Sequence, residues 1–166
     1  MAVEHLKSTA VTNATATPLV LSDAILEGGG LREAVGVTQA SASASIGSTY
    51  RLVRVPSNAR VSQVLLSCDA FDTTGAGDVG LYDVDGGDAV DADFFASAQS
   101  LTVALSNSDV THESGVFGIE DSEKPLWKAL GLSEDPHKDY DVAITLTTAN
   151  GASATPDVAL KVRYVV

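Results

Sequence analysis

The chain has 166 residues, of which 45% are hydrophobic and only 5% aromatic, so it is long enough for one domain with a core of small aliphatic side chains. Its net charge of −12 at pH 7 argues against nucleic acid as a partner, because binding phosphate requires clustered Lys and Arg. The single cysteine, Cys68, excludes an intrachain disulfide and a Cys-rich zinc site.

The excess negative charge is concentrated in the middle of the chain. No Lys or Arg occurs between Val61 and Glu123, whereas the flanking segments 1–60 and 124–166 are close to neutral. The thirteen acids of this base-free region are Asp69, Asp72, Asp78, Asp83, Asp85, Asp88, Asp91, Asp93, Asp109, Glu113, Glu120, Asp121 and Glu123.

The first 18 residues show neither a helical stripe nor strict alternation and end at Pro18. They predict an N-terminal arm, residues 1–18, that is ordered only against a neighbour, followed by a single domain over residues 19–166. No apolar stretch is long enough for a signal peptide or a membrane span, so we expect a chain that is made in the cytoplasm and has no membrane partner. The apolar residues through which the arm would bind a partner are Val3, Leu6, Val11 and Leu19.

Alternation of apolar and polar residues predicts a series of strands. Leu19–Leu21 predicts a short strand, and a longer one is predicted over residues 37–46, where a strict Ser/Ala alternation favours a strand over a flexible linker. Further strands are predicted at residues 48–56, 59–71, 78–84, 100–106, 139–149 and 157–166. The turn tripeptide Pro56-Ser57-Asn58 predicts that the strands on either side of it pair as a hairpin.

Two segments break the alternation and predict short helices. Residues 91–95 resemble a helical turn that begins at an Asp cap and places Phe94 and Phe95 in the core, and residues 121–131 have a cap, an early proline and a terminating glycine, with Trp127 in the core. With so little helix and no alternation of strands and helices, the pattern predicts an all-β fold: an antiparallel β-sandwich, jelly-roll-like, with one or two short helices and an extended N-terminal arm.

Several motifs resemble chemical signatures but fail at specific positions. Gly75–Gly80 matches the dinucleotide-binding pattern, but a strand follows it where a helix is required. His112-Glu113 begins like a zinc-protease helix, but Val116 stands where the second histidine belongs. Cys68 lies in an apolar alternation typical of a buried structural thiol. We therefore predict no catalytic residues, no cofactor and no histidine-based metal site.

The loop around residues 83–93 contains five aspartates and two glycines. The pattern fails as an EF-hand because Asp88 occupies the glycine position and Phe94 the final glutamate position. An acidic turn between strands is the favoured interpretation. A looser calcium site remains open, with Asp83, Asp85 and Asp88 as weak candidate ligands, and so does a carboxylate pair for glycoside hydrolysis.

Three segments carry a resemblance to a known family. STYRLVRVPSNARVSQVLL, DVGLYDVDGGDAVDADFFASAQSL and PLWKALGLSEDPHKDYDVAITLT, which lie within residues 48–147, resemble decoration (cement) proteins of tailed-bacteriophage capsids. Residues 1–47 and the last strand lie outside the resemblance.

The resemblance implies a non-enzymatic virion structural protein that binds the outside of a phage capsid across capsomer junctions and stabilises the shell. Its implied partners are the major capsid protein and further copies of itself, with a homotrimer favoured over a dimer, and its location is the capsid exterior after synthesis in the host cytoplasm. An alternative is a tail- or fibre-associated module that binds host glycan or calcium. A small hydrolase that uses Asp pairs is the third hypothesis.

Overall fold

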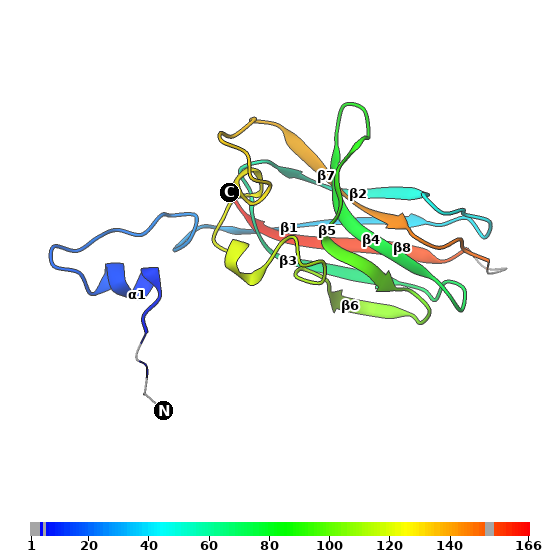
Figure 1. Ribbon diagram of the computed structural model, residues 1–166, viewed down its shortest axis with the longest axis horizontal. Coiled ribbons are helices and arrows are strands. Elements are labelled where there is room, and N and C mark those ends of the chain that lie inside the picture. Colours follow the sequence, from blue (N-terminus) through cyan, green and yellow to red (C-terminus); the bar gives the residue numbers. More distant parts are fainter. Residues whose placement is uncertain (1–3, 5, 152–154) are drawn as a thin grey trace. The chain divides into compact units, whose positions relative to one another are not determined.

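The computed structural model describes residue 4, residues 6–151 and residues 155–166. The chain divides into two compact units, Met1–Gly30 and Leu31–Val166 (Figure 1). The sequence predicted an arm that ends at residue 18, so this division lies further along the chain. The second unit holds every strand and the whole hydrophobic core among the described residues.

The second unit is a sandwich of two four-stranded antiparallel sheets. The strands are β1 Leu31–Gln39, β2 Thr49–Pro56, β3 Arg60–Cys68, β4 Ala76–Asp83, β5 Ala89–Ser100, β6 Leu105–Asp109, β7 Asp139–Leu146 and β8 Asp157–Val165. One sheet has the order β1-β8-β3-β6 and the other β2-β7-β4-β5. Successive strands alternate between the sheets except at β4–β5, which is the connectivity of an eight-stranded jelly roll. The all-β sandwich predicted from the sequence is confirmed.

The core lies between the two sheets and is built by alternating side chains. On β8, Val158, Leu160 and Val162 are fully buried, as the period of two predicted. The largest aromatic contact joins Phe94 and Phe95 of β5 to Phe117, with ring centroids 5.0–5.4 Å apart. Phe117 lies outside the strands, so this contact anchors the long β6–β7 connection to the core.

Residues 91–95 form part of β5 and not the predicted helical turn. The adjacent Phe94 and Phe95 are both fully buried and both contact the Phe117 ring, although side chains of a regular strand alternate between its two faces. The β4–β5 pairing shifts register at three places between Gly77 and Tyr82, and such irregularities let neighbouring residues turn to the same side. The prediction that both rings enter the core is confirmed, although the predicted secondary structure is wrong.

The predicted hairpin across Pro56-Ser57-Asn58 is also wrong, although both of its strands exist. β2 pairs with β7, whereas β3 pairs with β8 and β6, so the turn carries the chain from one sheet to the other. Turn residues indicate that the chain changes direction, but the same residue types occur in hairpins and in connections that cross from one sheet to the other. They therefore do not predict which strands pair.

Three further strand predictions differ from the structure. Residues 19–21 are not in a strand, and the strand predicted at residues 37–46 is the end of β1, which stops at Gln39. The Ser/Ala segment after it is a loop that buries Ala40 and Ala44. The strand predicted at residues 100–106 spans the loop between β5 and β6. Short side chains fit a strand or a tight loop equally well, so alternation of Ser and Ala is a weak signal.

The helices are short. The structure contains α1 Thr9–Ala14, the 3-10 helix η1 Ile119–Asp121 and α2 Leu126–Ala129. The sequence did not predict α1, which begins with Ser8 accepting a hydrogen bond from the Val11 amide. The predicted helix near residues 121–131 is confirmed as η1 and α2, but Trp127 is only partly buried, and Leu126 is the residue of α2 that enters the core. Within the described part of the chain, no helix is long and apolar enough to span a membrane.

Candidate functional site: the acidic loop and the exposed apolar residues

Residues 83–88, which we call the acidic loop, consist of the last residue of β4 and the connection to β5 (Figure 1). The chain turns back on itself here because the Asp83 amide donates to the Asp88 carbonyl at 2.9 Å and the Gly87 amide donates to the Asp83 carbonyl at 3.1 Å. Gly87 has a φ of 76°, a conformation that side chains other than glycine rarely adopt. The glycines of this segment therefore serve the turn, as the sequence predicted.

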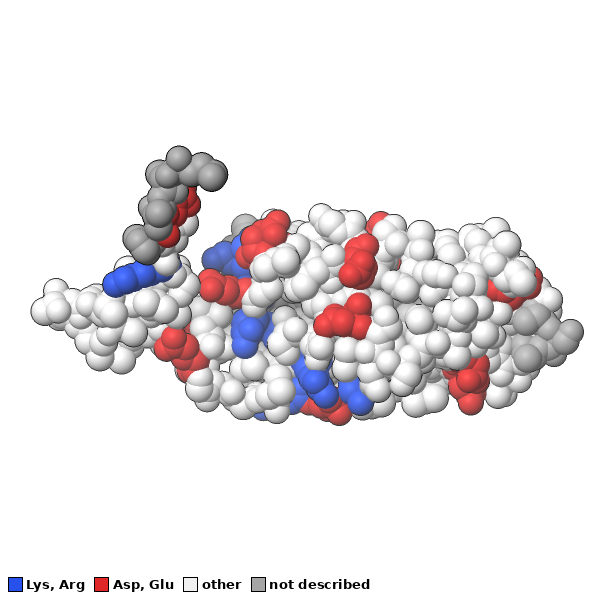
Figure 2. Space-filling view, turned by 90° about the horizontal axis from the view of Figure 1, so that it is seen from below, with Lys and Arg blue, Asp and Glu red and all other residues white. Residues whose placement is uncertain are grey.

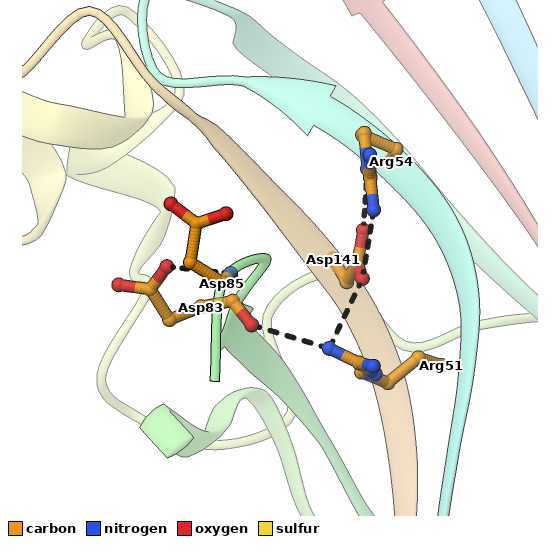
Figure 3. Close-up of polar contacts among 5 residues, drawn as sticks. All are labelled: Arg51, Arg54, Asp83, Asp85 and Asp141. Atoms are coloured by element: carbon orange, nitrogen blue, oxygen red, sulfur yellow. Dashed lines mark hydrogen bonds and ion pairs between the residues drawn. The ribbon is translucent and has the colours of Figure 1, made fainter. Parts of the chain in front are cut away.

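Two arginines of β2 contact Asp141 of β7, and one of them also contacts the acidic loop. Arg54 holds Asp141 with two hydrogen bonds, from Nε at 2.8 Å and from Nη2 at 3.4 Å. Arg51 contacts both β7 and the acidic loop. Its Nη1 atom lies 3.5 Å from the Asp141 carboxylate and donates a hydrogen bond to the Asp83 carbonyl at 3.2 Å (Figure 3). Asp141 is only 7% exposed, so it needs these charged partners. The cluster fastens the loop to the β2–β7 pair.

Lys138, the residue before β7, forms the other contact to the acidic loop. Its ammonium group makes an ion pair with the Asp83 carboxylate and lies 5.1 Å from the centre of the Tyr140 ring. The hydrogen bond from Lys138 lowers the pKa of Asp83, and the same bond raises the pKa of Lys138. Bases from outside the base-free region thus neutralise part of the acidic segment.

The structure does not bring the three calcium candidates together around an empty centre. Asp83 is paired with Lys138, and the Asp83 carboxylate also accepts from the Asp85 amide at 3.3 Å. Among the described residues, no group of three His, Cys, Asp or Glu side chains has the spacing to hold a metal ion. Calcium binding by Asp83, Asp85 and Asp88 stays a prediction.

A second carboxylate pair lies further along β5. Burial and the neighbouring Asp93 raise the pKa of Asp91, and the Asp93 amide donates to the Asp91 carboxylate at 3.3 Å. A raised pKa next to a second carboxylate is a feature of glycosidase acids. Here both residues are on one strand, two positions apart, so they do not flank a site from opposite sides as the hydrolysis of a glycosidic bond requires.

Ser57, Asp135 and His137 form the arrangement closest to a catalytic triad. They line a hollow of about 220 Å³ near the β2–β3 turn. The Ser57 hydroxyl donates to the Asp135 carboxylate, and this bond lowers the pKa of Asp135. His137 approaches the other oxygen of Asp135, at 3.4 Å. A triad needs the imidazole between the hydroxyl and the carboxylate, so this order of groups does not activate the serine.

The remaining motif residues have structural contacts. The His112 Nδ1 atom lies 3.0 Å from the Phe117 carbonyl, and the imidazole stacks on the Phe117 ring. Cys68 is buried, and its burial raises the pKa of the thiol, as expected for a structural cysteine. Residues 76–80 of the Gly75–Gly80 pattern lie within β4, so the predicted glycine turn is wrong, and the segment is a strand where the dinucleotide-binding pattern requires a turn into a helix.

The predicted partner-binding residues are exposed wherever the structure describes them. Leu6 is 87% exposed, Val11 48% and Leu19 64%, whereas Val3 lies outside the described residues. No described residue of the first unit is buried. Large exposed apolar residues that the sequence did not single out are Val20, Leu21 and Leu26 in this unit and Leu31, Val35 and Val37 on β1. The β1 residues could have been found from their alternation, since they occupy every second position except Glu33.

Comparison with known proteins gives similarity at the level of structure. No protein-family model matches the chain, and no curated protein sequence matches it. A chain in the capsid of Ralstonia phage GP4 is similar with a TM-score of 0.59 and 17% identity, over 82% of this chain and 84% of that one. A chain in the capsid asymmetric unit of cyanophage Pam1 has a TM-score of 0.49 and 18% identity, over 83% and 86% of the two chains. A chain in the acid-stable capsid of Helicobacter pylori bacteriophage KHP30 has a TM-score of 0.40 and 17% identity, over 82% and 87%. The jelly roll described above is therefore a fold that also occurs in a phage capsid, which agrees with the resemblance carried by residues 48–147.

Proposed function

We propose that this chain is a non-enzymatic structural protein of a tailed-phage virion that binds the outside of the capsid across capsomer junctions and stabilises the shell. The observation that carries the proposal is the jelly roll shared with a chain of the Ralstonia phage GP4 capsid over most of both chains. Fold similarity alone does not assign a function, so the properties of the surface are the second support.

The exposed residues fit a protein that works by contact. The first unit buries none of its described residues. Five of its aliphatic side chains are 48% or more exposed, and Leu26 is 40% exposed; the five are Leu6, Val11, Leu19, Val20 and Leu21. A segment with so much exposed apolar surface is suited to order against a partner, which here would be the major capsid protein or another copy of the chain. A homotrimer is the favoured assembly and a dimer the alternative.

The described polar clusters support a role without catalysis. The Ser57–Asp135–His137 group has the wrong order for a nucleophile, and the Asp91–Asp93 pair lies on a single strand. The alternative function is a tail- or fibre-associated module that binds glycan or calcium. It is less well supported, because the Asp83 carboxylate, a candidate calcium ligand, already forms an ion pair with Lys138.

The proposal is tested with phage heads that lack this protein. Purified protein is mixed with such heads, and the bound fraction is measured by co-sedimentation while the release of DNA is followed on heating. We expect saturable binding and a higher temperature for DNA release. Many equivalent contacts on a head reinforce one another, so stabilisation is expected even if each contact is weak. Heads that sediment without the protein would contradict the proposal.

A further inference from the structure

Four loops form one end of the jelly roll, and we call this end the base-free end. The loops are residues 40–48, 69–75, 101–104 and 147–151. Backbone hydrogen bonds connect them, from the Asn150 amide to the Ala44 carbonyl at 2.8 Å and from the Phe71 amide to the Leu101 carbonyl at 2.9 Å. The Thr148 hydroxyl completes the connection by donating to the Thr74 carbonyl at 2.9 Å. In Figure 1 these loops lie at the right-hand end of the sandwich, opposite the C-terminus.

The base-free end contains no Lys or Arg and carries Asp69 and Asp72, with Asp157 beside them at the start of β8. On the face shown in Figure 2, Lys and Arg lie toward the other end of the sandwich, whereas Asp and Glu extend along its length. Within the described part of the chain, none of these three carboxylates takes part in an ion pair. They accept hydrogen bonds from uncharged groups: Asp157 from the Gln39 side chain at 3.3 Å, Asp69 from the Asp157 amide at 3.1 Å, and Asp72 from the Thr73 amide at 2.6 Å. This end therefore presents uncompensated negative charge.

An apolar hollow lies next to these carboxylates. It has a volume of about 230 Å³ and is lined by β3, β6 and β8, with Asp69 and Asp157 among the lining residues. Its other lining residues are Ser67, Cys68, Ala104, Leu105, Val158 and Ala159. The hollow is open to solvent, so a side chain of a partner can enter it.

The hollow adjoins two aliphatic side chains on the outer face of the sheet, Val37 and Ala159, which we call the aliphatic row. Val37 of β1 pairs with Ala159 of β8, which pairs with Ser67 of β3, so the three side chains lie side by side on one face. Val37 is 67% exposed, and Val103, in the loop that borders the hollow, is 62% exposed. Aliphatic surface thus adjoins carboxylates that form no ion pair.

We infer that the base-free end, with the hollow beside it, is the surface that docks on the capsid shell, and that it binds a segment of the shell protein carrying aliphatic side chains flanked by Lys or Arg. The inference rests on the proposed function and adds which surface is used and what chemistry it recognises. An aliphatic side chain fills the hollow, and the flanking bases meet Asp69, Asp72 and Asp157.

The charges argue against a second copy of the chain as the occupant. Two base-free ends facing each other would bring like charges together, which opposes association. The first unit of another copy is also a poor match, because it contains Glu4, Asp23 and Glu27 but only one lysine, Lys7. A basic partner of a different sequence matches both the charge and the hollow.

The inference is tested by binding to heads that lack the protein, with two variants that add the same charge at opposite ends. Val37→Lys places a cation in the aliphatic row, and the matched control Ile119→Lys changes an aliphatic residue that is 78% exposed in the β6–β7 connection. We expect Val37→Lys to weaken binding by about tenfold or more and Ile119→Lys to bind as the wild type does. Raising NaCl from 50 to 300 mM should weaken wild-type binding, because salt screens the carboxylates.

The outcomes separate this inference from the proposed function. If the wild type binds the heads and Val37→Lys binds equally well, the docking surface is wrong while the function stands. If the wild type leaves the heads bare, both fail. Asp157→Asn is a second variant that retains the backbone of β8, so it tests the charge even if Val37→Lys lowers the melting temperature; unchanged binding and unchanged salt dependence with this variant would overturn the inference.

Discussion

Lys138 makes its two side-chain contacts to different parts of the sheet, the Asp83 carboxylate at the end of β4 and the Tyr140 ring on β7. Because the hydrogen bond to Lys138 lowers the pKa of Asp83, the pair stabilises the folded state above the pKa of an unfolded aspartate, and this contribution is lost as the pH falls through the lower, folded pKa.

Lys138→Met should therefore reduce the stability slightly at neutral pH, and the reduction should shrink as the pH falls from about 4, the pKa of an unfolded aspartate, through the lower pKa that Asp83 has in the folded state. The measurement is urea unfolding of wild type and variant between pH 3 and 7. Lys128→Met, which removes the same charge from an exposed position of α2, is the control and should show little pH dependence. An equal penalty for Lys138→Met at every pH would contradict the role of the pair.

The contacts of the acidic loop could be predicted only in part from the sequence. Asp and Gly indicate a turn by local chemistry, and the turn was found where the glycines placed it. Arg54 and Asp141, in contrast, are 87 positions apart and meet only because β2 pairs with β7. Pairing of distant strands depends on the whole fold, so the partners of the buried Asp141 had no local signal.

At the scale of elements, β1 and β2 come close although they belong to different sheets. Leu52 is the extra residue of a register shift in the β2–β7 pairing. A Cβ atom added to Gly36 of β1 would lie 1.9 Å from the Leu52 carbonyl oxygen, which is part of the backbone and has little freedom to move. Gly36 therefore allows the edges of the two sheets to meet.

Gly36→Ala should lower the free energy of unfolding by about 1–3 kcal/mol, the usual cost of overpacking, or shift β1 away from β2. Chemical denaturation measures the loss, and hydrogen exchange of the β1 amides locates it. Gly30→Ala is the matched control, because a Cβ atom at Gly30 meets no neighbour within 4 Å. If both variants unfold at the same denaturant concentration as the wild type, the close approach does not constrain the fold.

The elements show where patterns in the sequence are informative. The strands with aliphatic alternation, such as β8, were predicted with bounds close to those observed, because burial of one face imposes the period of two. The adjacent Phe94 and Phe95 broke that period and were interpreted as a helix, since irregular pairing in β4–β5 cannot be recognised from one strand alone. The turn at Pro56-Ser57-Asn58 was recognised, but the sheet to which each strand belongs was not.

At the scale of the whole molecule, charge and apolar surface are distributed unevenly. The described loops at one end of the jelly roll carry aspartates without Lys or Arg, and the first unit exposes aliphatic residues without burying any. Neither feature is needed to form the core, which is complete between the two sheets. Both features suit a protein that acts by attachment to a larger assembly.

The most direct test of this account is a cryo-EM reconstruction of mature heads to which the purified protein has been added. The account predicts jelly-roll density on the outside of the shell at capsomer junctions, with the base-free end toward the shell. Heads without added density, or density confined to the tail or the interior, would contradict the account of a capsid-binding structural protein.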